Sequence, residues 1–284
     1  MPLTLIIEIG MVVFPNAKIN LGLNIVSKRP DGYHNIETLF YPIGLSDVLE
    51  VVPAANPAAG TQLHLSGIVV DGAAGDNLVM KACRLLSDRF ELPEVDICLD
   101  KIIPFGAGLG GGSSDAAFML RLLRDMYRLP VTDDELCRLA AGIGADCPFF
   151  LLNRPVMARG IGNEFETVDF SLSGKYLVLV KPPVKVSTPE AYSLVKPQVP
   201  EMSIPEILNR PLAEWRFLLK NDFEKSVFAR YPRIEEIKAL LYERGAAYAS
   251  MSGSGSSVFG LFEAPADLDG AFEDCFVWQG DCLY

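Results

Sequence analysis

The stretch from Pro104 to Ala117 holds five glycines and two serines and runs directly into a segment with a helical pattern. Glycine lets backbone N–H groups approach an anion because no Cβ stands in the way. The amino-terminal end of a helix adds unpaired N–H donors and partial positive charge. A simple turn needs only one or two glycines. The stretch therefore predicts a loop that holds phosphate, and a purely structural loop is the alternative.

Two common nucleotide motifs do not fit this stretch. A Walker A loop requires a lysine directly before its serine or threonine, and no lysine precedes Ser113. Gly106, Gly108 and Gly111 satisfy the Gly-x-Gly-x-x-Gly spacing of dinucleotide folds, which also need an acidic residue about 20 positions later at a strand end. The acidic residue there is Asp125, which lies in a helical pattern. A nicotinamide or flavin site is therefore disfavoured.

A lysine and an aspartate lie in settings where they could move protons or stabilise charge. Residues 17–25 alternate between apolar and polar side chains, which predicts a strand with Lys18 and Asn20 on its polar face. Lys18 is therefore either solvated or functional. Asp146 stands among apolar residues in 144–149, where a lone carboxylate is costly without a cation or hydrogen-bond donors. The alternative for Asp146 is a helix cap or a turn.

Two further segments gather small or polar residues. Residues 251–257 form a second loop of glycines and serines, which by itself could be a tight turn. Asp31 to His34 is typical of a turn that presents an aromatic ring and an imidazole together. His64, the other histidine, is expected to be a structural or exposed strand residue.

Composition limits the function classes. With 284 residues, 50% of them hydrophobic, the chain can bury the core of two domains or of one large domain. A net charge of −11 argues against a nucleic-acid partner, which normally needs a basic surface. The six cysteines lack the spacing of a zinc site, so free, reduced thiols in a cytoplasmic protein are expected. Glu8 interrupts a short apolar run, so neither a signal peptide nor a membrane span is predicted, and residues 1–10 are interpreted as an extension.

The order of elements predicts an α+β fold, because strands and helices mix without a regular β-α repeat. The expected strands lie in 12–52, in a short pair at 61–70, and at 95–103, 175–181, 247–251 and 257–262. The expected helices run from a cap at Asp76 to about Phe90, from a cap at Ser113 or Ser114 to about Leu129, from Thr132 to about Gly142, and over 213–229 and 233–244. The proline-rich residues 197–211 are expected to be a loop. The glycine-rich stretch therefore connects a strand to a helix.

Together these segments resemble the galactokinase, homoserine kinase, mevalonate kinase and phosphomevalonate kinase (GHMP) superfamily. Within it, the chain is similar to the 4-diphosphocytidyl-2-C-methyl-D-erythritol kinases of the non-mevalonate isoprenoid pathway. The residues that carry this resemblance are Pro15 to Leu21, Asp31 to His34, Gly108 to Ser114, Gly144 to Pro148 and Met251 to Ser257. Asn221 to Glu224 also looks like the family, with packing or capping as its expected role.

The resemblance implies a two-domain GHMP kinase fold. Residues 1–158 would form an N-terminal domain like domain 2 of ribosomal protein S5, and residues 159–284 a ferredoxin-like C-terminal domain. ATP would give its γ-phosphoryl group to the 2-hydroxyl of the methylerythritol unit. Asp146 would accept the hydroxyl proton, and Lys18 would keep Asp146 ionised and stabilise the transferring group. Mg²⁺ would bridge the phosphates mostly through water and substrate oxygens, and no residue of the sequence is a convincing protein ligand for it.

The resemblance also implies which residues contact the two substrates. The implied ATP contacts are Lys101, Pro104, Phe105, Gly106, Ala107, Gly108, Leu109, Gly110, Gly111, Gly112, Ser113 and Ser114, with a solvated Lys101 as the alternative. The implied contacts of the second substrate are Asn20, Tyr33, His34, Thr188 and Tyr192. Tyr33, His34 and Tyr192 would hold the cytosine, since bases stack on aromatic rings.

Two alternatives accompany this interpretation. Another GHMP small-molecule kinase, acting on mevalonate or homoserine, would have no cytosine to bind, so Tyr33, His34 and Tyr192 argue against it. A catalytically inactive, ligand-sensing homologue is disfavoured because Lys18 and Asp146 are both present. The expected partners are small molecules rather than nucleic acid or membrane, and the oligomeric state stays open.

Overall fold

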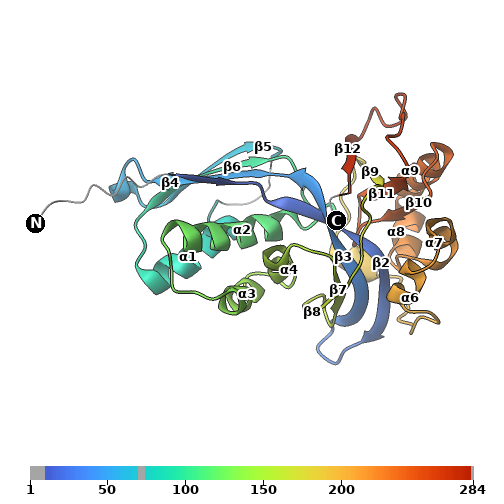
Figure 1. Cartoon of the computed structure of the whole chain (residues 1–284), viewed down its shortest axis with the longest axis horizontal. Coiled ribbons are helices and arrows are strands. Elements are labelled where there is room, and N and C mark those ends of the chain that lie inside the picture. The colour runs from blue at the N-terminus through green and yellow to red at the C-terminus, as the bar shows by residue number, and fades with distance from the viewer. Residues whose placement is uncertain (1–9, 70–73, 283–284) are drawn as a thin grey trace, which may run out of the picture. The chain divides into compact units, whose positions relative to one another are not determined.

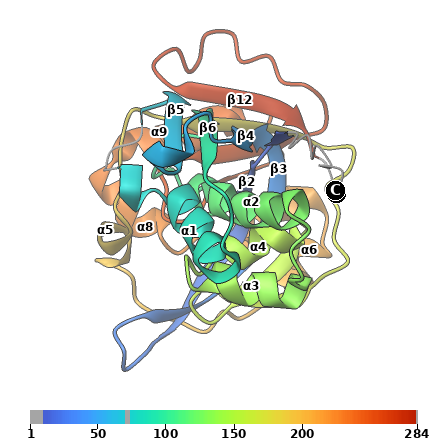
Figure 2. The same cartoon turned by 90° about the vertical axis from the view of Figure 1, so that its left-hand side faces the viewer.

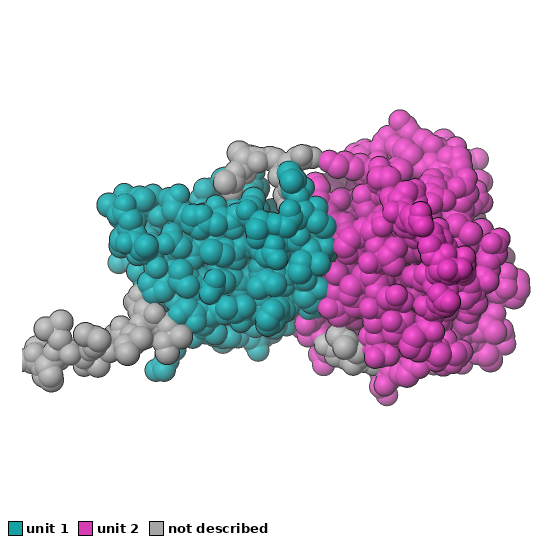
Figure 3. Space-filling model, turned by 90° about the horizontal axis from the view of Figure 1, so that it is seen from above, with its two compact units in different colours: residues 1–16, 46–103, 111–151 teal, residues 17–45, 104–110, 152–284 magenta. Residues whose placement is uncertain are grey.

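The chain divides into two compact units that interleave along the sequence. The computed structural model describes residues 10–69 and 74–282, so nearly all of the expected extension, residues 1–10, lies outside the described residues. The first unit comprises residues 1–16, 46–103 and 111–151, and the second comprises residues 17–45, 104–110 and 152–284 (Figure 3). The boundary expected between residues 158 and 159 divides the chain differently and stays a prediction.

The first unit is a four-stranded sheet with helices on one face. Its strands follow the order β1 (Met11–Val13), β4 (Val48–Pro53), β6 (Val95–Lys101) and β5 (Gln62–Gly67). Strand β5 runs parallel to β6, and the other pairs are antiparallel. The helices are α1 (Leu78–Phe90), α2 (Gly111–Met126), α3 (Asp133–Ala141) and α4 (Cys147–Leu152), with 3-10 turns at Pro57–Ala59 and Ala74–Asp76. Helices α1 and α2 lie along one face of the sheet (Figure 1, Figure 2).

Strand β6 leads from the core of the first unit to the glycine-rich loop. Val95, Ile97 and Leu99 face inward and are fully buried, whereas the residues between them are half-buried. Because side chains alternate along a strand, Lys101 falls on the same inward face. It is only 4% exposed. The strand therefore brings a lysine into the interior just before the loop begins.

The second unit contains two four-stranded sheets. One has the order β10 (Tyr248–Met251), β11 (Val258–Phe262), β9 (Tyr176–Lys181) and β12 (Phe276–Asp281), with antiparallel pairs throughout. This is the strand order of a ferredoxin-like fold, although the described residues 263–275 between β11 and β12 form turns where that fold has a helix. The other sheet has the order β2 (Asn16–Lys28), β3 (His34–Ser46), β7 (Val156–Arg159) and β8 (Glu164–Thr167). The helices are α5 (Thr188–Tyr192), α6 (Ile204–Leu208), α7 (Leu212–Leu218), α8 (Glu224–Arg230) and α9 (Pro232–Glu243).

Several expected element boundaries were wrong in the first unit. Asn77, not Asp76, caps α1, and its side chain accepts a hydrogen bond from the Val79 N–H at 2.9 Å. Ser113 and Ser114 do not cap α2, because the helix begins at Gly111 and both serines lie within its first turn. Residues 61–70 contribute one strand, β5, rather than a pair, and residue 70 lies outside the described residues.

In the second unit, long-range contacts and a missed cap explain the differences. The helix expected over 213–229 is two helices, α7 and α8, because the chain between them pairs with β2 at Leu23 through a bridge to Asn221. The expected loop at 197–211 contains α6, which opens with a capping box between Ser203 and Glu206. Strands β7, β8 and β12 were not expected from the sequence.

Candidate active site

The glycine-rich loop combines an unusual backbone with the start of a long helix. Gly106, Gly108 and Gly110 have φ values of 62°, 75° and 72°, a left-handed region that favours glycine. Helix α2 then begins at Gly111. A Cβ on Gly108 would lie 2.0 Å from the carbonyl oxygen of Ser252. Glycine is therefore required in this loop by conformation and, at Gly108, also by space.

Lys18 is buried in β2 and hydrogen-bonded within the second unit. Its ammonium donates to Oδ1 of Asn20 at 2.6 Å and to the carbonyl oxygen of Gly108 at 2.8 Å. It also lies 5.0 Å from the centre of the Phe40 ring. At 6% exposure, Lys18 is not solvated, so that alternative was wrong. The contacts tie the lysine to the glycine-rich loop.

The second glycine–serine loop, residues 251–257, supports the first one. The Ser252 hydroxyl donates to the carbonyl oxygen of Gly108 at 2.9 Å and accepts from the backbone N–H of Asn20 at 3.3 Å. The Ser257 N–H donates to the carbonyl oxygen of Ala107 at 3.3 Å. The segment is therefore more than a tight turn, since it holds Ala107 and Gly108 through their carbonyl groups.

Asn221 to Glu224 holds this second loop in turn, a role that the sequence reasoning missed. The Asn221 amide donates to the carbonyl oxygens of Met251 and Gly253, both at 2.8 Å. Glu224 accepts from the Met251 N–H at 2.9 Å. Asp222 accepts from the Ile25 N–H at 2.7 Å, and burial raises the pKa of its carboxyl group. Three hydrogen-bonding side chains in one short segment between helices were the available signal.

Asp146 lies in the first unit, directly before α4. Its carboxylate and the Ser113 hydroxyl both border Gly144, because a Cβ there would lie 3.8 Å from Oδ1 of Asp146 and 3.6 Å from Oγ of Ser113. The same Cβ would lie 3.0 Å from Sγ of Cys147. Burial, and then the charge of Asp146, raise the pKa of the Cys147 thiol to about 12, so the thiol stays protonated. Within this unit, a half-buried carboxylate therefore lies near the first turn of α2.

Lys101 is buried and is therefore not solvated. Its ammonium bonds to the carboxylates of Asp47 and Asp115 inside the first unit. The alternative of a solvated Lys101 was wrong. Its expected contact with ATP stays a prediction, but two carboxylates already neutralise the charge that such a contact would use.

The residues expected at cytosine lie in the second unit, and two of them touch. The rings of His34 and Tyr192 stack with centroids 4.6 Å apart and planes at 16°. Phe223 meets Tyr192 edge-on at 4.7 Å. Tyr33 is 62% exposed, and the Asp31 carboxylate fixes its turn by accepting from the Tyr33 N–H at 3.1 Å. Thr188 is exposed in the first turn of α5.

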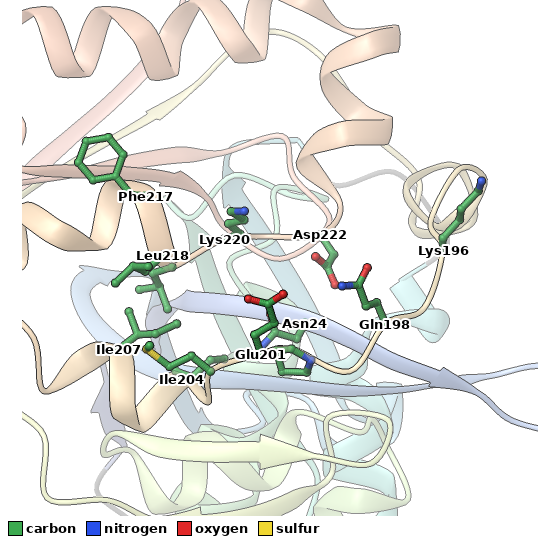
Figure 4. A pocket seen from close by; sticks show the side chains of 13 residues that line it. Asn24, Lys196, Gln198, Glu201, Ile204, Ile207, Phe217, Leu218, Lys220 and Asp222 are labelled. Carbon is green, nitrogen blue, oxygen red and sulfur yellow. The ribbon is translucent and has the colours of Figure 1, made fainter.

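A pocket of about 540 Å³ lies elsewhere in the second unit, where none of the expected site residues lines it. Apolar side chains, among them Ile204, Ile207 and Leu218, line one side, and polar ones, among them Asn24 and Asp222, line the other (Figure 4). We propose the glycine-rich loop rather than this pocket for the chemistry, because no glycine is among the residues that line the pocket.

Three remaining expectations concern the rest of the chain. His64 is an exposed residue of β5, as expected. Among the described residues, no cluster of three His, Cys, Asp or Glu side chains could hold a metal ion. In the same part of the chain, no helix is long and apolar enough to cross a membrane.

Comparison with known proteins defines the class first. The family model for the N-terminal domain of GHMP kinases matches residues 77–154, and the model for the C-terminal domain matches residues 203–274. The solved mevalonate kinase of Methanococcus jannaschii shares the fold, with a TM-score of 0.70 at 12% identity. The expected two-domain α+β fold of a GHMP kinase is therefore confirmed.

Closer relatives define the family. The 4-diphosphocytidyl-2-C-methyl-D-erythritol kinase of Parabacteroides distasonis is 60% identical over 95% of this chain and 99% of its own. That of Porphyromonas gingivalis is 53% identical over 95% and 98%. A crystal structure of 4-(cytidine 5'-diphospho)-2C-methyl-D-erythritol kinase has 35% identity and a TM-score of 0.79 over 95% of this chain and 98% of that one. The chain belongs to the family of 4-diphosphocytidyl-2-C-methyl-D-erythritol kinases, which confirms the resemblance inferred from the motifs.

Proposed function

We propose that this chain transfers the γ-phosphoryl group of ATP to the 2-hydroxyl of 4-diphosphocytidyl-2-C-methyl-D-erythritol. Family membership over 95% of the chain supports the substrate. The glycine-rich loop supports the donor, because its backbone and the start of α2 offer N–H groups to an anion. Mg²⁺ enters as MgATP, held through phosphate and water oxygens.

The observation that carries this proposal is the position of Asp146 beside the first turn of α2. A phosphate held by Gly111 to Ser114 would lie within reach of a carboxylate that borders Ser113. Phosphoryl transfer needs positioning and charge stabilisation, plus a group that takes the proton of the attacking hydroxyl. Asp146 is the carboxylate proposed for that proton.

Lys18 is proposed to stabilise the negative charge of the transferring group. Burial and two hydrogen bonds, to Asn20 and to the carbonyl of Gly108, hold its ammonium in one position. A preorganised charge is worth more in such a setting than on a solvated side chain, because it need not be reoriented during the reaction. Asn20 is proposed to contact the acceptor substrate from the same strand.

The cytidine end is proposed to bind at Tyr33, His34 and Tyr192. The rings of His34 and Tyr192 stack, and Phe223 packs edge-on against Tyr192. Tyr33, exposed on its fixed turn, supplies a third ring. Thr188, one turn before Tyr192 on α5, is proposed as a weaker contact.

The enzyme is proposed to work in the cytoplasm. All six cysteines are free, and three of them, Cys83, Cys147 and Cys282, are buried. Reduced thiols are usual in a reducing compartment.

A panel of acceptors tests the proposed function. Purified protein is given ATP and Mg²⁺ with diphosphocytidyl methylerythritol, mevalonate or homoserine, and the release of ADP is measured. We expect turnover only with the cytidylyl substrate. Turnover with mevalonate or homoserine instead would favour another GHMP kinase activity, and no turnover with any acceptor would favour an inactive homologue.

A further inference from the structure

Three buried charged residues of the first unit form a cluster next to the glycine-rich loop, which we call the clamp: Asp47, Lys101 and Asp115. Lys101 donates to Oδ2 of Asp47 and, at 2.6 Å, to Oδ2 of Asp115. All three side chains are at most 5% exposed. A buried ammonium between two carboxylates is strongly held, because its removal would leave both carboxylates buried without a cation.

The clamp fixes the backbone where the loop begins. The other carboxylate oxygen of Asp47 accepts from the N–H groups of Ile102 and Ile103, at 2.5 Å and 2.7 Å. The Asp47 N–H itself donates to the carbonyl oxygen of Pro15 at 2.9 Å. Asp47 is therefore anchored and holds the last two residues before Pro104.

The clamp also fixes the backbone where the loop ends. Asp115 lies in the first turn and a half of α2, and its contact with Lys101 joins the helix to β6. A Cβ on Gly111 would lie 2.9 Å from Cγ2 of Ile103 and 3.5 Å from Nζ of Lys101. Helix α2 thus starts close against Ile103, two residues after the end of β6. Residues 104–110 are tied down at both ends.

We propose that Lys101 is a positioning residue for ATP, which together with Asp47 and Asp115 fixes both ends of the glycine-rich loop and does not itself bind phosphate. The proposal rests on the proposed function in that the loop is taken to bind ATP. In this proposal, Lys101 acts on ATP by holding the backbone of the loop in place, and its ammonium does not contact the phosphates.

The charge of the clamp should change with pH, which gives a way to test the proposal. One ammonium cannot neutralise two buried carboxylates, so burial, and then the charge of Asp47, raise the pKa of Asp115 to about 7 against the opposing effect of Lys101. Oδ1 of Asp115 has no hydrogen-bond partner within the described part of the chain. Lys101 and Asp47 are the charged groups that act on Asp115. Near neutral pH the clamp therefore exchanges one proton.

Loss of that proton adds a negative charge beside the first turn of α2, where the phosphates of ATP are proposed to bind. ATP affinity should then fall as the pH rises through about 7, because like charges repel at short range in a poorly solvated site.

The first experiment compares the wild type with Asp115→Asn, which keeps the shape of the side chain and cannot ionise. Calorimetry gives the Kd of MgATP from about pH 6 to about pH 8.5, and the titration of ATP itself cancels in the ratio of the two proteins. We expect the wild-type Kd to rise several-fold relative to that of Asp115→Asn across this range. Asp125→Asn, the same substitution at the far end of α2, should follow the wild type. Identical profiles for the wild type and Asp115→Asn would overturn the proposal.

The second experiment replaces Lys101 by methionine. We expect the Kd of MgATP to rise several-fold, because both ends of the loop lose the ammonium that holds them, with little change in the KM of the second substrate. A folded Lys101→Met protein with unchanged ATP affinity would overturn the proposal. If Lys101→Met does not fold, the profile of Asp115→Asn decides alone.

The proposal and the proposed function can fail separately. A wild-type protein that binds MgATP with the expected pH profile but phosphorylates no cytidylyl substrate would support the role of the clamp and contradict the proposed function. An active kinase whose ATP affinity does not depend on the ionisation of Asp115 would support the proposed function and contradict the proposed role of the clamp.

Discussion

Lys18 and Lys101 are both buried, and their partners separate their roles. Lys18 donates to the amide oxygen of Asn20 and to the carbonyl of Gly108, which position the ammonium at the glycine-rich loop. Lys101 donates to two carboxylates, which do cancel its charge. At the scale of single residues, the contact of Lys18 with the glycine-rich loop is the reason for proposing that it stabilises the transferring phosphoryl group. The two carboxylates bonded to Lys101 are the reason for proposing that Lys101 holds the loop.

Asp146→Asn should abolish most turnover while ATP binding persists. The amide has nearly the same shape but cannot accept the hydroxyl proton, so we expect kcat to fall roughly 10²- to 10⁴-fold. Steady-state kinetics give kcat, and calorimetry gives the Kd of MgATP. Asp134→Asn, at the exposed start of α3, is the matched control and should leave kcat unchanged. A folded Asp146→Asn enzyme with near-normal kcat would remove Asp146 from the proton transfer.

Tyr192→Ala should raise the KM of the cytidylyl substrate without changing the KM of ATP. Loss of base stacking is worth about 1–3 kcal/mol, so a rise of roughly tenfold is expected. Because Tyr192 also packs on His34 and Phe223, the melting temperature should drop as well. Tyr192→Phe keeps the ring and should restore both quantities. Equal KM values for the cytidylyl substrate in all three proteins would contradict a cytosine contact at Tyr192.

At the scale of elements, the segments that carry the motifs could be predicted from the sequence, whereas the distant residues that hold these segments in place could not. The glycine-rich loop between β6 and α2 could be expected from the residues themselves, because a strand pattern, a glycine run and a helical pattern follow one another. The burial of Lys101 was also available, since it continues the inward-facing set that includes Ile97 and Leu99. Its pairing with Asp47 could not be predicted, because 54 residues separate Lys101 from Asp47 and no local sequence pattern pairs them.

The same limit explains the differences elsewhere in the fold. Helices α7 and α8 are separate because residues 220–222 pair with β2, a contact that helical periodicity does not reveal. Asn221 holds the second loop through the carbonyls of Met251 and Gly253, about 30 residues along the chain. Cap positions, such as Asn77 instead of Asp76, depend on which neighbouring side chain reaches the free N–H groups of the helix.

Gly110→Val should weaken ATP binding much more than binding of the second substrate. The φ of 72° at Gly110 is unfavourable for a β-branched residue, and a side chain there would also meet a phosphate on the loop. Gly174→Val is a matched control, because Gly174 has a φ of 82° in a turn with open space around it. Both variants should lose stability, but only Gly110→Val should raise the Kd of MgATP in calorimetry. Equal ATP affinity in the two variants would place the phosphate site elsewhere.

At the scale of the whole molecule, the chain is strongly acidic and buries two basic side chains, those of Lys18 and Lys101, among the described residues. The net charge is −11, so we propose that binding of ATP depends on local positive potential from backbone N–H groups, the start of α2 and Lys18. The clamp adds to this balance, because its three residues would carry a net negative charge if all of them were ionised. This makes the stability of the folded chain sensitive to the protonation of Asp115.

The free energy of unfolding should report that protonation. The carboxyl of Asp115 has a pKa of 3.8 in an ordinary setting and about 7 in the fold, so between these values the folded state holds a proton that the unfolded state has lost. Asp115 should therefore lower the free energy of unfolding by about 1.4 kcal/mol per pH unit as the pH rises through this window, and not above it. Urea unfolding of the wild type and Asp115→Asn gives the difference between them, in which other groups cancel. A difference that is constant from about pH 4 to about pH 8 would show that Asp115 does not hold the proton.

The product of the reaction tests the central claim most directly. Phosphorus NMR of a mixture of the wild-type protein, MgATP and diphosphocytidyl methylerythritol follows every phosphorus atom at once. We expect ADP and one new phosphomonoester to appear in equal amounts, while the diphosphate that links cytidine to methylerythritol stays intact. Methylerythritol phosphate, which lacks the cytidine, should give the corresponding product far more slowly. Release of ADP without a new phosphomonoester, cleavage of the diphosphate link, or equal rates for the two acceptors would contradict the account.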